Sequence, residues 1–291
     1  MRFTKMHGIG NDFLFLDAMA EPAILERKDL SEIALRLCNR HTGVGADGLI
    51  IVSEPAPGSG VDALMRTINS DGSEGEMCGN GLRCLAKLVV ERGYVTPDER
   101  GGLTIDIGDR RVTVAVVLGP SGQVTAATVD MGPPVLEPAL VPIDESALNS
   151  ARRGPGGEYR VEHRDATFVS MGNPHMVAFL DEPVGGVDLR AEGPMFETHR
   201  AFPRRMNYHI VNVLGRGEVR VRTWERGAGM TLGCGSGACA VVVAGAASGR
   251  TARHARVHMP GGDLDVRWDE QSGHVLMTGP AAEVFHGEWP G

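Results

Sequence analysis

An internal repeat constrains this chain more than any other feature of its sequence. The segment RTINSDGSEGEMCGNG begins at Arg66, and the segment RTWERGAGMTLGCGSG begins at Arg222, 156 residues later. In both segments a cysteine follows the arginine by 12 positions, and glycine, a polar residue and glycine come next. A repeat of this length is too long for a solenoid unit. It indicates a duplicated domain, with two similar halves around a shared cleft.

The apolar pattern around each repeat predicts a mixed α/β fold. Alternating stretches at 63–68, 111–116 and 218–222 predict half-buried strands. An apolar stretch follows each cysteine motif and predicts a helix, Leu82–Glu91 in the first half and Ala238–Ala247 in the second. The second stretch is apolar on all sides, so we expect it to be buried, as a helix wrapped by sheet would be.

Further local signals mark one more helix, two loops and the domain boundaries. A helix is expected over Leu30–Asn39, behind a capping-box pattern of Asp29 and Glu32. Glycine and proline predict loops at 55–60 and 150–159. We place the first domain at 1–127 plus 277–291 and the second at 128–276.

Charge and hydropathy exclude several classes of protein. The formal net charge is −8, and no run of lysine or arginine forms the basic stripe of a nucleic-acid binder. The longest apolar run, Ala238–Ala247, is half the roughly 20 residues that cross a bilayer, and the first residues lack the apolar region of a signal peptide. We therefore expect a cytoplasmic protein with no membrane or nucleic-acid partner.

The five cysteines predict reduced thiols and no metal site. They are odd in number, widely spread and without a Cys-x-x-Cys or zinc-finger spacing. Cys38, Cys84 and Cys239 fall within predicted helices at core-like spacing, where cysteine behaves as a small apolar residue. Cys78 and Cys234 instead stand among glycines where a helix begins, which is poor for core packing and favourable for chemistry.

A cysteine at a helix start lies beside unpaired N–H groups and the positive end of the helix dipole. We expect that position to lower the pKa of the thiol. The glycines around it allow a ligand carboxylate to approach the backbone closely. Two such sites that face each other suit the inversion of a carbon next to a carboxylate, because one thiolate removes a proton while the opposite thiol donates one.

No cofactor is obligatory for that reaction, and no motif for one is present. The sequence has no Walker loop, and GMTLGCGSG at 229–237 has its glycines in the wrong order for a dinucleotide-binding loop. The expected ligand is a small amino acid.

At these residues the sequence resembles the diaminopimelate epimerases over nearly its full length. The resemblance is carried by KMHGIGNDF at 5–13, NSDGSEGEMCGNGLRC at 69–84, SMGNPH at 170–175, FPRRMN at 202–207 and ERGAGMTLGCGSGACA at 225–240. It implies two similar, pseudo-symmetric domains, each a mostly antiparallel sheet curled around a central helix, with the active site between them. The implied reaction interconverts LL- and meso-diaminopimelate, a step in lysine and peptidoglycan precursor synthesis, without pyridoxal phosphate.

The resemblance also implies roles for individual residues. Cys78 and Cys234 match the family's proton donor and acceptor, and His175 and Glu225 match residues that tune the thiols. The implied substrate-binding residues are Asn11, Asn69, Gly79, Asn80, Asn173, Asn207, Glu225, Arg226, Gly235 and Ser236. An arginine such as Arg226 suits a second carboxylate because its guanidinium is a forked cation.

Two positions depart from the family pattern. Gly48 stands where some members have a glutamine contact, so that contact is absent or made by the backbone. Phe285 stands where some members have a tyrosine linked to dimer formation, so the homodimer that the resemblance implies lacks this contact here.

Other interpretations of the same residues stay open at this stage. A two-cysteine proline or hydroxyproline racemase would need an apolar pocket in place of Arg226, and a phenazine-pathway isomerase lacks the paired cysteines. A noncatalytic carboxylate-binding protein would use the glycine loops and leave the thiols idle. An isolated asparagine is often only a turn residue, and His175 after Pro174 reads equally well as an ordinary loop histidine.

Overall fold

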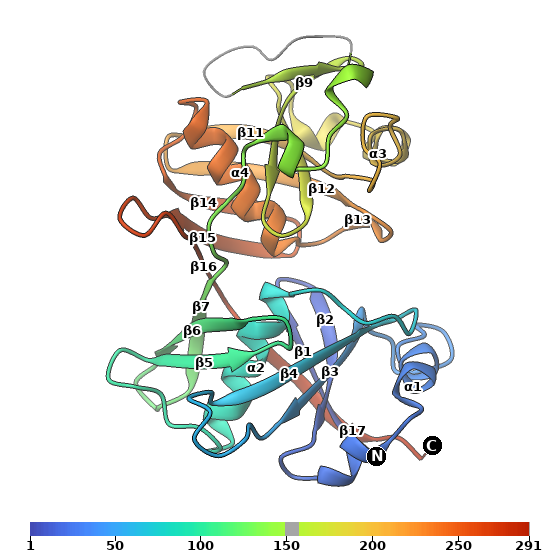
Figure 1. The fold of residues 1–291 in the computed structure, drawn as a ribbon, viewed down its shortest axis with the longest axis vertical. Coiled ribbons are helices and arrows are strands. Elements are labelled where there is room, and N and C mark those ends of the chain that lie inside the picture. Colours follow the sequence, from blue (N-terminus) through green and yellow to red (C-terminus); the bar gives the residue numbers. More distant parts are fainter. Residues whose placement is uncertain (149–156, 291) are drawn as a thin grey trace. The chain divides into compact units, whose positions relative to one another are not determined.

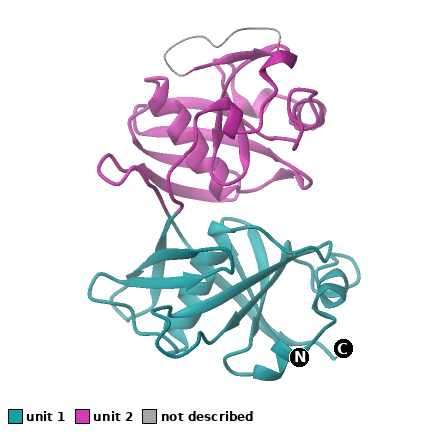
Figure 2. Cartoon of the chain, in the orientation of Figure 1, with its two compact units in different colours: residues 1–130, 278–291 teal, residues 131–277 magenta. Residues whose placement is uncertain are grey.

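The computed structural model describes residues 1–148 and 157–290 and divides the chain into two compact units (Figure 2). Unit 1 comprises Met1–Asp130 and the segment from Thr278 onward, and unit 2 comprises Met131–Met277. The divisions thus fall after Asp130 and Met277, where the sequence suggested 127 and 276. The final strand, β17, belongs to unit 1 because it pairs antiparallel with β1.

Unit 1 is a mostly antiparallel sheet with two helices. Its strands pair in the order β17–β1–β2–β3–β4–β5–β6–β7, and only the β2–β3 and β4–β5 pairs are parallel. The elements are β1 Arg2–Gly8, β2 Asn11–Asp17, α1 Leu30–Leu37, β3 Gly48–Ser53, β4 Ala63–Asn69, α2 Gly79–Glu91, β5 Gly102–Asp106, β6 Arg111–Leu118, β7 Val124–Asp130 and β17 Ala282–Glu288.

Unit 2 has the same kind of sheet. Its strands pair in the order β8–β9–β10–β11–β12–β14–β15, β13 adds to β12, and only the β10–β11 and β12–β14 pairs are parallel. The elements are β8 Tyr159–Val161, β9 Arg164–Ser170, β10 Pro174–Phe179, α3 Leu189–Glu197, β11 Asn207–Gly215, β12 Glu218–Glu225, β13 Gly229–Thr231, α4 Gly235–Ala247, β14 His254–Met259, β15 Gly262–Trp268 and, where the chain returns to unit 1, β16 Val275–Gly279.

The two units repeat one topology. From β1 to β6 the successive pairs are antiparallel, parallel, antiparallel, parallel and antiparallel, with α1 after the second strand and α2 after the fourth. From β9 to β15 the pairs alternate in the same way, with α3 and α4 at the equivalent places. The prediction of two similar α/β halves, each a mostly antiparallel sheet, is confirmed.

The central helix of each unit begins directly after its cysteine. Helices α2 and α4 start at Gly79 and Gly235, three residues earlier than the apolar pattern indicated. Helix α4 is buried without interruption over Gly237–Gly245 and contacts β9, β10, β11, β14 and β15 (Figure 1). Helix α2 likewise contacts β1, β2, β4, β6 and β7. The prediction of a buried helix wrapped by sheet is therefore confirmed.

Two local predictions need correction. Helix α1 ends at Leu37 and has no side-chain N-cap, because the Asp29 carboxylate accepts hydrogen bonds from Arg27 Nε at 2.9 Å and Nη2 at 2.6 Å. The predicted capping box is thus wrong. The loop at 55–60 is confirmed, whereas 149–156 lie outside the described residues and Tyr159 already belongs to β8.

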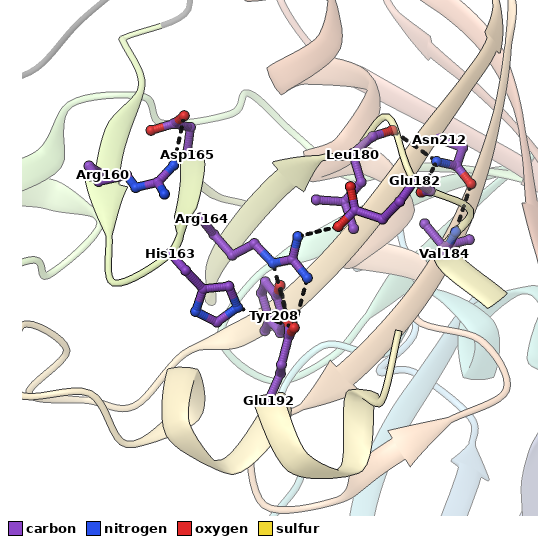
Figure 3. A network of polar contacts seen from close by, with 10 residues as sticks. All are labelled: Arg160, His163, Arg164, Asp165, Leu180, Glu182, Val184, Glu192, Tyr208 and Asn212. Carbon is purple, nitrogen blue, oxygen red and sulfur yellow. Dashed lines mark hydrogen bonds and ion pairs between the residues drawn. The ribbon is translucent and has the colours of Figure 1, made fainter. Parts of the chain in front are cut away.

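A polar network fixes α3 against one face of the unit 2 sheet (Figure 3). Glu192 of α3 accepts hydrogen bonds from Arg164 Nη2 of β9 at 2.7 Å and from Tyr208 Oη of β11 at 3.0 Å. Since successive side chains of a strand point to opposite faces, Asn207 and His209 point away from α3. They lie on the face of β11 that packs against α4.

Among the described residues, no helix has both the length and the apolar character needed to span a bilayer.

Candidate active site

Cys78 occupies the N-cap position of α2 in unit 1. Its backbone is extended, with φ −118° and ψ 104°, and its sulfur accepts a hydrogen bond from the Gly81 N–H at 3.4 Å. Its thiol donates to Asn11 Oδ1 at 3.6 Å. The sulfur therefore lies among the first N–H groups of the helix, where the dipole favours negative charge.

A chain of hydrogen bonds fixes the side chains around Cys78. Arg83, which is fully buried, donates from Nη2 to Asn80 Oδ1 at 2.8 Å. Asn80 Nδ2 donates to Asn11 Oδ1 at 3.0 Å, and Asn11 Nδ2 donates to Asp47 Oδ2 at 2.7 Å. A guanidinium can only donate and a carboxylate only accepts, so the ends of the chain set the orientation of both amides. The oxygen of Asn11 is thereby turned toward Cys78.

Asn69 lies at the same end of the unit 1 sheet but makes local contacts. It is the last residue of β4 and pairs with Gly48, the first residue of β3. Its side chain is exposed and donates from Nδ2 to Ser73 Oγ at 3.0 Å. In the described residues Asn69 thus holds a turn together, as an ordinary turn asparagine would.

Cys234 occupies the N-cap position of α4 in unit 2, but its electrostatics differ from the expectation. Burial, followed by the charge of Glu225 and a hydrogen bond with it, holds the pKa of the Cys234 thiol well above its usual range. The Gly237 N–H and the Ser236 hydroxyl, whose oxygen is 3.7 Å from the sulfur, oppose this and do not outweigh it. The expected lowering of this pKa by the helix start is therefore wrong for this structure. The Cys234 thiol is therefore protonated at neutral pH.

Strand β12 ends at Glu225, and the loop that begins with Arg226 is held from two sides. The Arg226 N–H donates to Asn207 Oδ1 at 3.0 Å, while Asn207 Nδ2 donates to the Pro174 carbonyl at 2.8 Å. The Gly227 N–H donates to Glu197 Oε1 of α3 at 3.0 Å. Asn207 is thus a bridge between β10 and the loop, and both of its amide ends are engaged.

His175 is buried on β10 and is no loop residue. Its side chain is fully buried, with Nε2 2.8 Å from Asn173 Oδ1 and Nδ1 2.9 Å from Nε2 of His209. Burial first, then the neighbouring His209 and the charge of Arg226, lower the pKa of His175 well below its usual value. His175 is therefore a neutral imidazole close to Arg226.

The predicted residues fall into two clusters, one in each unit. In unit 1, Asn11, Cys78 and Asn80 are in direct contact, with Gly79 between the last two. The cluster of unit 2 contains Asn173, His175, Asn207, Glu225, Arg226, Cys234, Gly235 and Ser236. In the described part of the chain, no group of three or more His, Cys, Asp and Glu side chains has the arrangement of a metal site.

Comparison with known proteins identifies the family. The profile described as diaminopimelate epimerase matches residues 3–137 and 167–284. The diaminopimelate epimerase of Pelotomaculum thermopropionicum is 44% identical over 293 residues, which cover 100% of this chain and 99% of that protein. The diaminopimelate epimerase of Heliobacterium modesticaldum is 43% identical over 294 residues, with 100% of both chains covered. The chain belongs to the diaminopimelate epimerase family.

Solved structures of other proteins share the fold of this family member. A phenazine biosynthesis protein of the PhzF family from Bacillus anthracis superposes with a TM-score of 0.66 at 15% identity, covering 99% of this chain and 98% of that one. A probable proline racemase from Agrobacterium radiobacter also gives 0.66, at 14% identity, with 99% and 92% covered. At these identities the likeness concerns the fold alone.

Several residues of the clusters escaped the sequence analysis. Asp47 and Arg83 fix the amides beside Cys78, and His209 contacts His175. Periodicity in the sequence could have indicated two of these residues, Arg83 and His209. Arg83 follows Asn80 by one helical turn, and His209 follows Asn207 by two positions on a strand, so each shares a face with a predicted residue. Asp47 carries no comparable local signal.

The departure at Gly48 has a steric reason. A Cβ at this position would lie 2.6 Å from the Ile68 carbonyl oxygen on the neighbouring strand. Because this obstacle is backbone, no larger side chain fits without a shift of β3 or β4. Any contact from Gly48 to a ligand is therefore limited to its backbone.

The contact between Glu225 and Cys234 yields a first testable prediction. In Glu225→Gln the pKa of Cys234 is expected to fall, because the charge that favours the protonated thiol is removed and the hydrogen bond from the thiol is left with a neutral, weaker acceptor. The 13C chemical shift of Cys234 Cβ, followed across pH, reports this titration. Glu270→Gln, which removes the same charge from an exposed position of unit 2, is the matched control and should leave the titration in place. An unchanged Cys234 titration in Glu225→Gln would contradict the assigned contact.

Proposed function

We propose that this protein is a cofactor-independent epimerase that interconverts LL- and meso-2,6-diaminopimelate, with Cys78 and Cys234 as the opposed acid and base. The main support is family membership, at 44% identity over the full length of a diaminopimelate epimerase. The two cysteines supply the chemistry this reaction requires. Each is the N-cap of the central helix of its unit, and the two helices occupy equivalent places in a repeated topology.

The proposed reaction moves one proton off the α-carbon and another onto it. The thiolate of one cysteine takes the α-proton, and its sulfur becomes a thiol. The thiol of the other cysteine gives its proton to the opposite face of the carbon and becomes the thiolate. The negative charge that develops on the α-carboxylate in between is stabilised by N–H groups at the helix starts. Atoms and charges balance, and the enzyme ends with the two protonation states exchanged.

The remaining predicted residues would bind the substrate or set the proton affinity of the thiols. We propose that Gly79, Asn80, Gly235 and Ser236 hold the α-carboxylate, and that Arg226 pairs with the distal carboxylate. In the same proposal Glu225 and His175 set the proton affinity of the thiols, and the four asparagines Asn11, Asn69, Asn173 and Asn207 contact the amino-acid groups. The role of Glu225 is supported by its contact with Cys234, where burial and then the Glu225 carboxylate raise the pKa of the thiol.

One incubation tests the proposal. The protein is mixed with LL-diaminopimelate in deuterated water without added cofactor, and the products are analysed by NMR. The expected product is the meso isomer with deuterium at one α-carbon. Turnover of proline or hydroxyproline at a comparable rate would favour a two-cysteine racemase of that class. Binding without any deuterium incorporation would favour a noncatalytic carboxylate-binding protein.

The proposal also covers the cellular location and the oligomeric state of the protein. We propose a cytoplasmic enzyme of lysine and peptidoglycan precursor synthesis, consistent with five cysteines that are all free. We also propose a homodimer, since β17 exposes Val284 and Phe285. Fractionation and sedimentation equilibrium test these two statements.

A further inference from the structure

A pair of buried histidines lies beside the cysteine helix of unit 2. His175 of β10 and His209 of β11 are both fully buried, and their rings meet through Nδ1 and Nε2 at 2.9 Å. At the outer ends, His175 Nε2 is 2.8 Å from Asn173 Oδ1, and His209 Nδ1 is 3.0 Å from Thr223 Oγ1. The four residues form one continuous row of hydrogen bonds that starts in the sheet and ends at Asn173.

Both imidazoles of this row are neutral. Burial lowers the pKa of His209 to about 3 and takes that of His175 well below its usual value. A neutral imidazole has one N–H and one bare nitrogen. Each of the two rings must therefore donate in one direction along the row and accept from the other.

Two directions would satisfy the rings, and Thr223 decides between them. If His209 donated to Thr223, the hydroxyl proton would need another acceptor, yet within the described residues the buried Thr223 hydroxyl meets His209 alone. A buried hydroxyl proton without an acceptor is costly, whereas an unused lone pair on oxygen costs little. Thr223 therefore donates to His209 Nδ1, and His209 Nε2–H donates to His175 Nδ1. His175 then donates from Nε2 to the oxygen of Asn173.

The direction of the row has a consequence at Asn173. Its amide oxygen is occupied by His175, so its two N–H donors point elsewhere, and no partner for them occurs in residues 1–148 and 157–290. Asn173 is only half-buried. The charge of Arg226 also acts on His175, which places a guanidinium in the same neighbourhood. Amide donors beside an arginine suit a carboxylate oxygen.

We propose that His209 is a positioning residue that holds His175 as the Nε2–H tautomer and so turns the Asn173 amide to present its N–H donors to a substrate carboxylate. The second half of this statement rests on the proposed function. Helix α4 fixes the ring of His209 in place, because a Cβ at Gly237 would lie only 2.3 Å from His209 Cε1. The same ring thus supports the helix whose N-cap is Cys234.

The tautomer is measured on the substrate-free protein by 15N NMR of the imidazole nitrogens. In the unmodified protein His175 is expected to show a protonated Nε2 and a bare Nδ1. His209→Gln keeps an N–H donor near the position of His209 Nε2, so it should retain this pattern. His209→Leu has no donor, and the His175 signals should shift toward a mixture of tautomers. A protonated Nδ1 in the unmodified protein would overturn the proposal.

Kinetics with diaminopimelate test the link to Asn173. His209→Leu should raise KM about fivefold, as the loss of one neutral hydrogen bond would, with a smaller effect on kcat, and His209→Gln should recover most of that loss. Asn173→Asp keeps the oxygen that accepts from His175 but lacks the N–H donors, so its KM should rise at least as far. Equal KM values in the Leu and Gln variants would contradict the positioning role.

The two proposals fail in different ways. If the tautomer is as expected but diaminopimelate exchanges no α-proton, the proposed function is wrong and the row of hydrogen bonds still holds. If epimerisation is found and the tautomer is reversed, the inference about His209 is wrong and the function stands. If His209→Leu does not fold, the tautomer of the unmodified protein and the KM values of His209→Gln and Asn173→Asp decide.

Discussion

Replacing Cys78 or Cys234 by alanine is expected to slow epimerisation by roughly a hundredfold or more, the usual contribution of a catalytic acid or base. One thiol cannot serve both faces of the α-carbon, so each replacement should be sufficient by itself. The rate is measured as the formation of meso product from LL-diaminopimelate in deuterated water. Circular dichroism of each variant establishes that the loss is chemical and not a failure to fold.

Cys38 and Cys84 provide matched controls for these variants. Both are buried in unit 1, and burial raises the pKa of each to about 12. Neither thiol belongs to the two clusters of predicted site residues, so neither is expected to exchange a proton with the substrate. Cys38→Ala and Cys84→Ala, each with Cys78 and Cys234 intact, should keep near-normal activity in folded protein. Near-normal activity of folded Cys78→Ala would instead refute the two-base mechanism.

The two similar units could be predicted from the sequence because the internal repeat indicates them. Cysteine, glycine and strand periodicity recur in both halves, and two copies of one local pattern fold into two copies of one topology. The helix starts were misplaced by three residues for a local reason. The Gly-Asn-Gly and Gly-Ser-Gly turns after the cysteines read as loop, yet in the structure their N–H groups begin the helices.

The electrostatics of the thiols depended on contacts that the sequence does not display. A helix start predicts a lowered pKa, but the pKa of Cys234 also depends on how deeply the sulfur is buried and on the approach of Glu225 from another strand. Helix α1 is a second example, because the Asp29 carboxylate that was expected to cap the helix accepts hydrogen bonds from Arg27 instead. Local sequence identified which groups were present, whereas tertiary contacts decided what they bonded to.

The buried polar rows were unforeseen for the same reason. Arg83 and His209 stand in apolar surroundings where a pattern of hydrophobicity predicts only core. Each finds its partners on elements far away in the chain, Arg83 at the Pro280 carbonyl and His209 at His175. A buried polar side chain is tolerated when its hydrogen bonds are made. Arg83 and His209 each contact a predicted site residue, Asn80 and His175, so these buried polar side chains link the core of each unit to its cluster of site residues.

Acidification from pH 7 to pH 5 is expected to lower the free energy of unfolding of unit 2 by about 2 kcal/mol through His209 alone. The pKa of His209 is about 3 in the folded protein and about 6.5 in an unfolded chain. At pH 5 the folded state therefore leaves this imidazole neutral, while the unfolded state takes up a proton. Stability is lost as the pH falls below about 6.5, and the loss from this group is complete near pH 3. His175 contributes with the same sign.

His209→Gln isolates this contribution, because glutamine does not titrate. Whatever its stability at pH 7, its further loss of stability between pH 7 and pH 5 should be smaller than that of the unmodified protein by about 2 kcal/mol. Carboxylates with lowered pKa values, such as Glu192 and Glu197, lose their contribution as the pH falls from their ordinary value of 4.5 through the lowered folded value, below this window. The raised pKa of His258 acts in the opposite direction but equally in both proteins, so it cancels.

Hydrogen exchange of the α4 amides, measured at both pH values, follows the opening of unit 2 specifically, since this helix is buried in its core. The change in α4 protection from pH 7 to pH 5 is compared between the unmodified protein and His209→Gln. Intrinsic exchange rates and the stability of unit 1 are the same in both proteins and therefore cancel. Equal pH dependence in the unmodified protein and in His209→Gln would mean that His209 takes up its proton alike in the folded and unfolded states, and so is charged in the folded protein at pH 5. A charged His209 would donate from both nitrogens, and the direction assigned to the row from Thr223 to Asn173 would then be wrong at its first step.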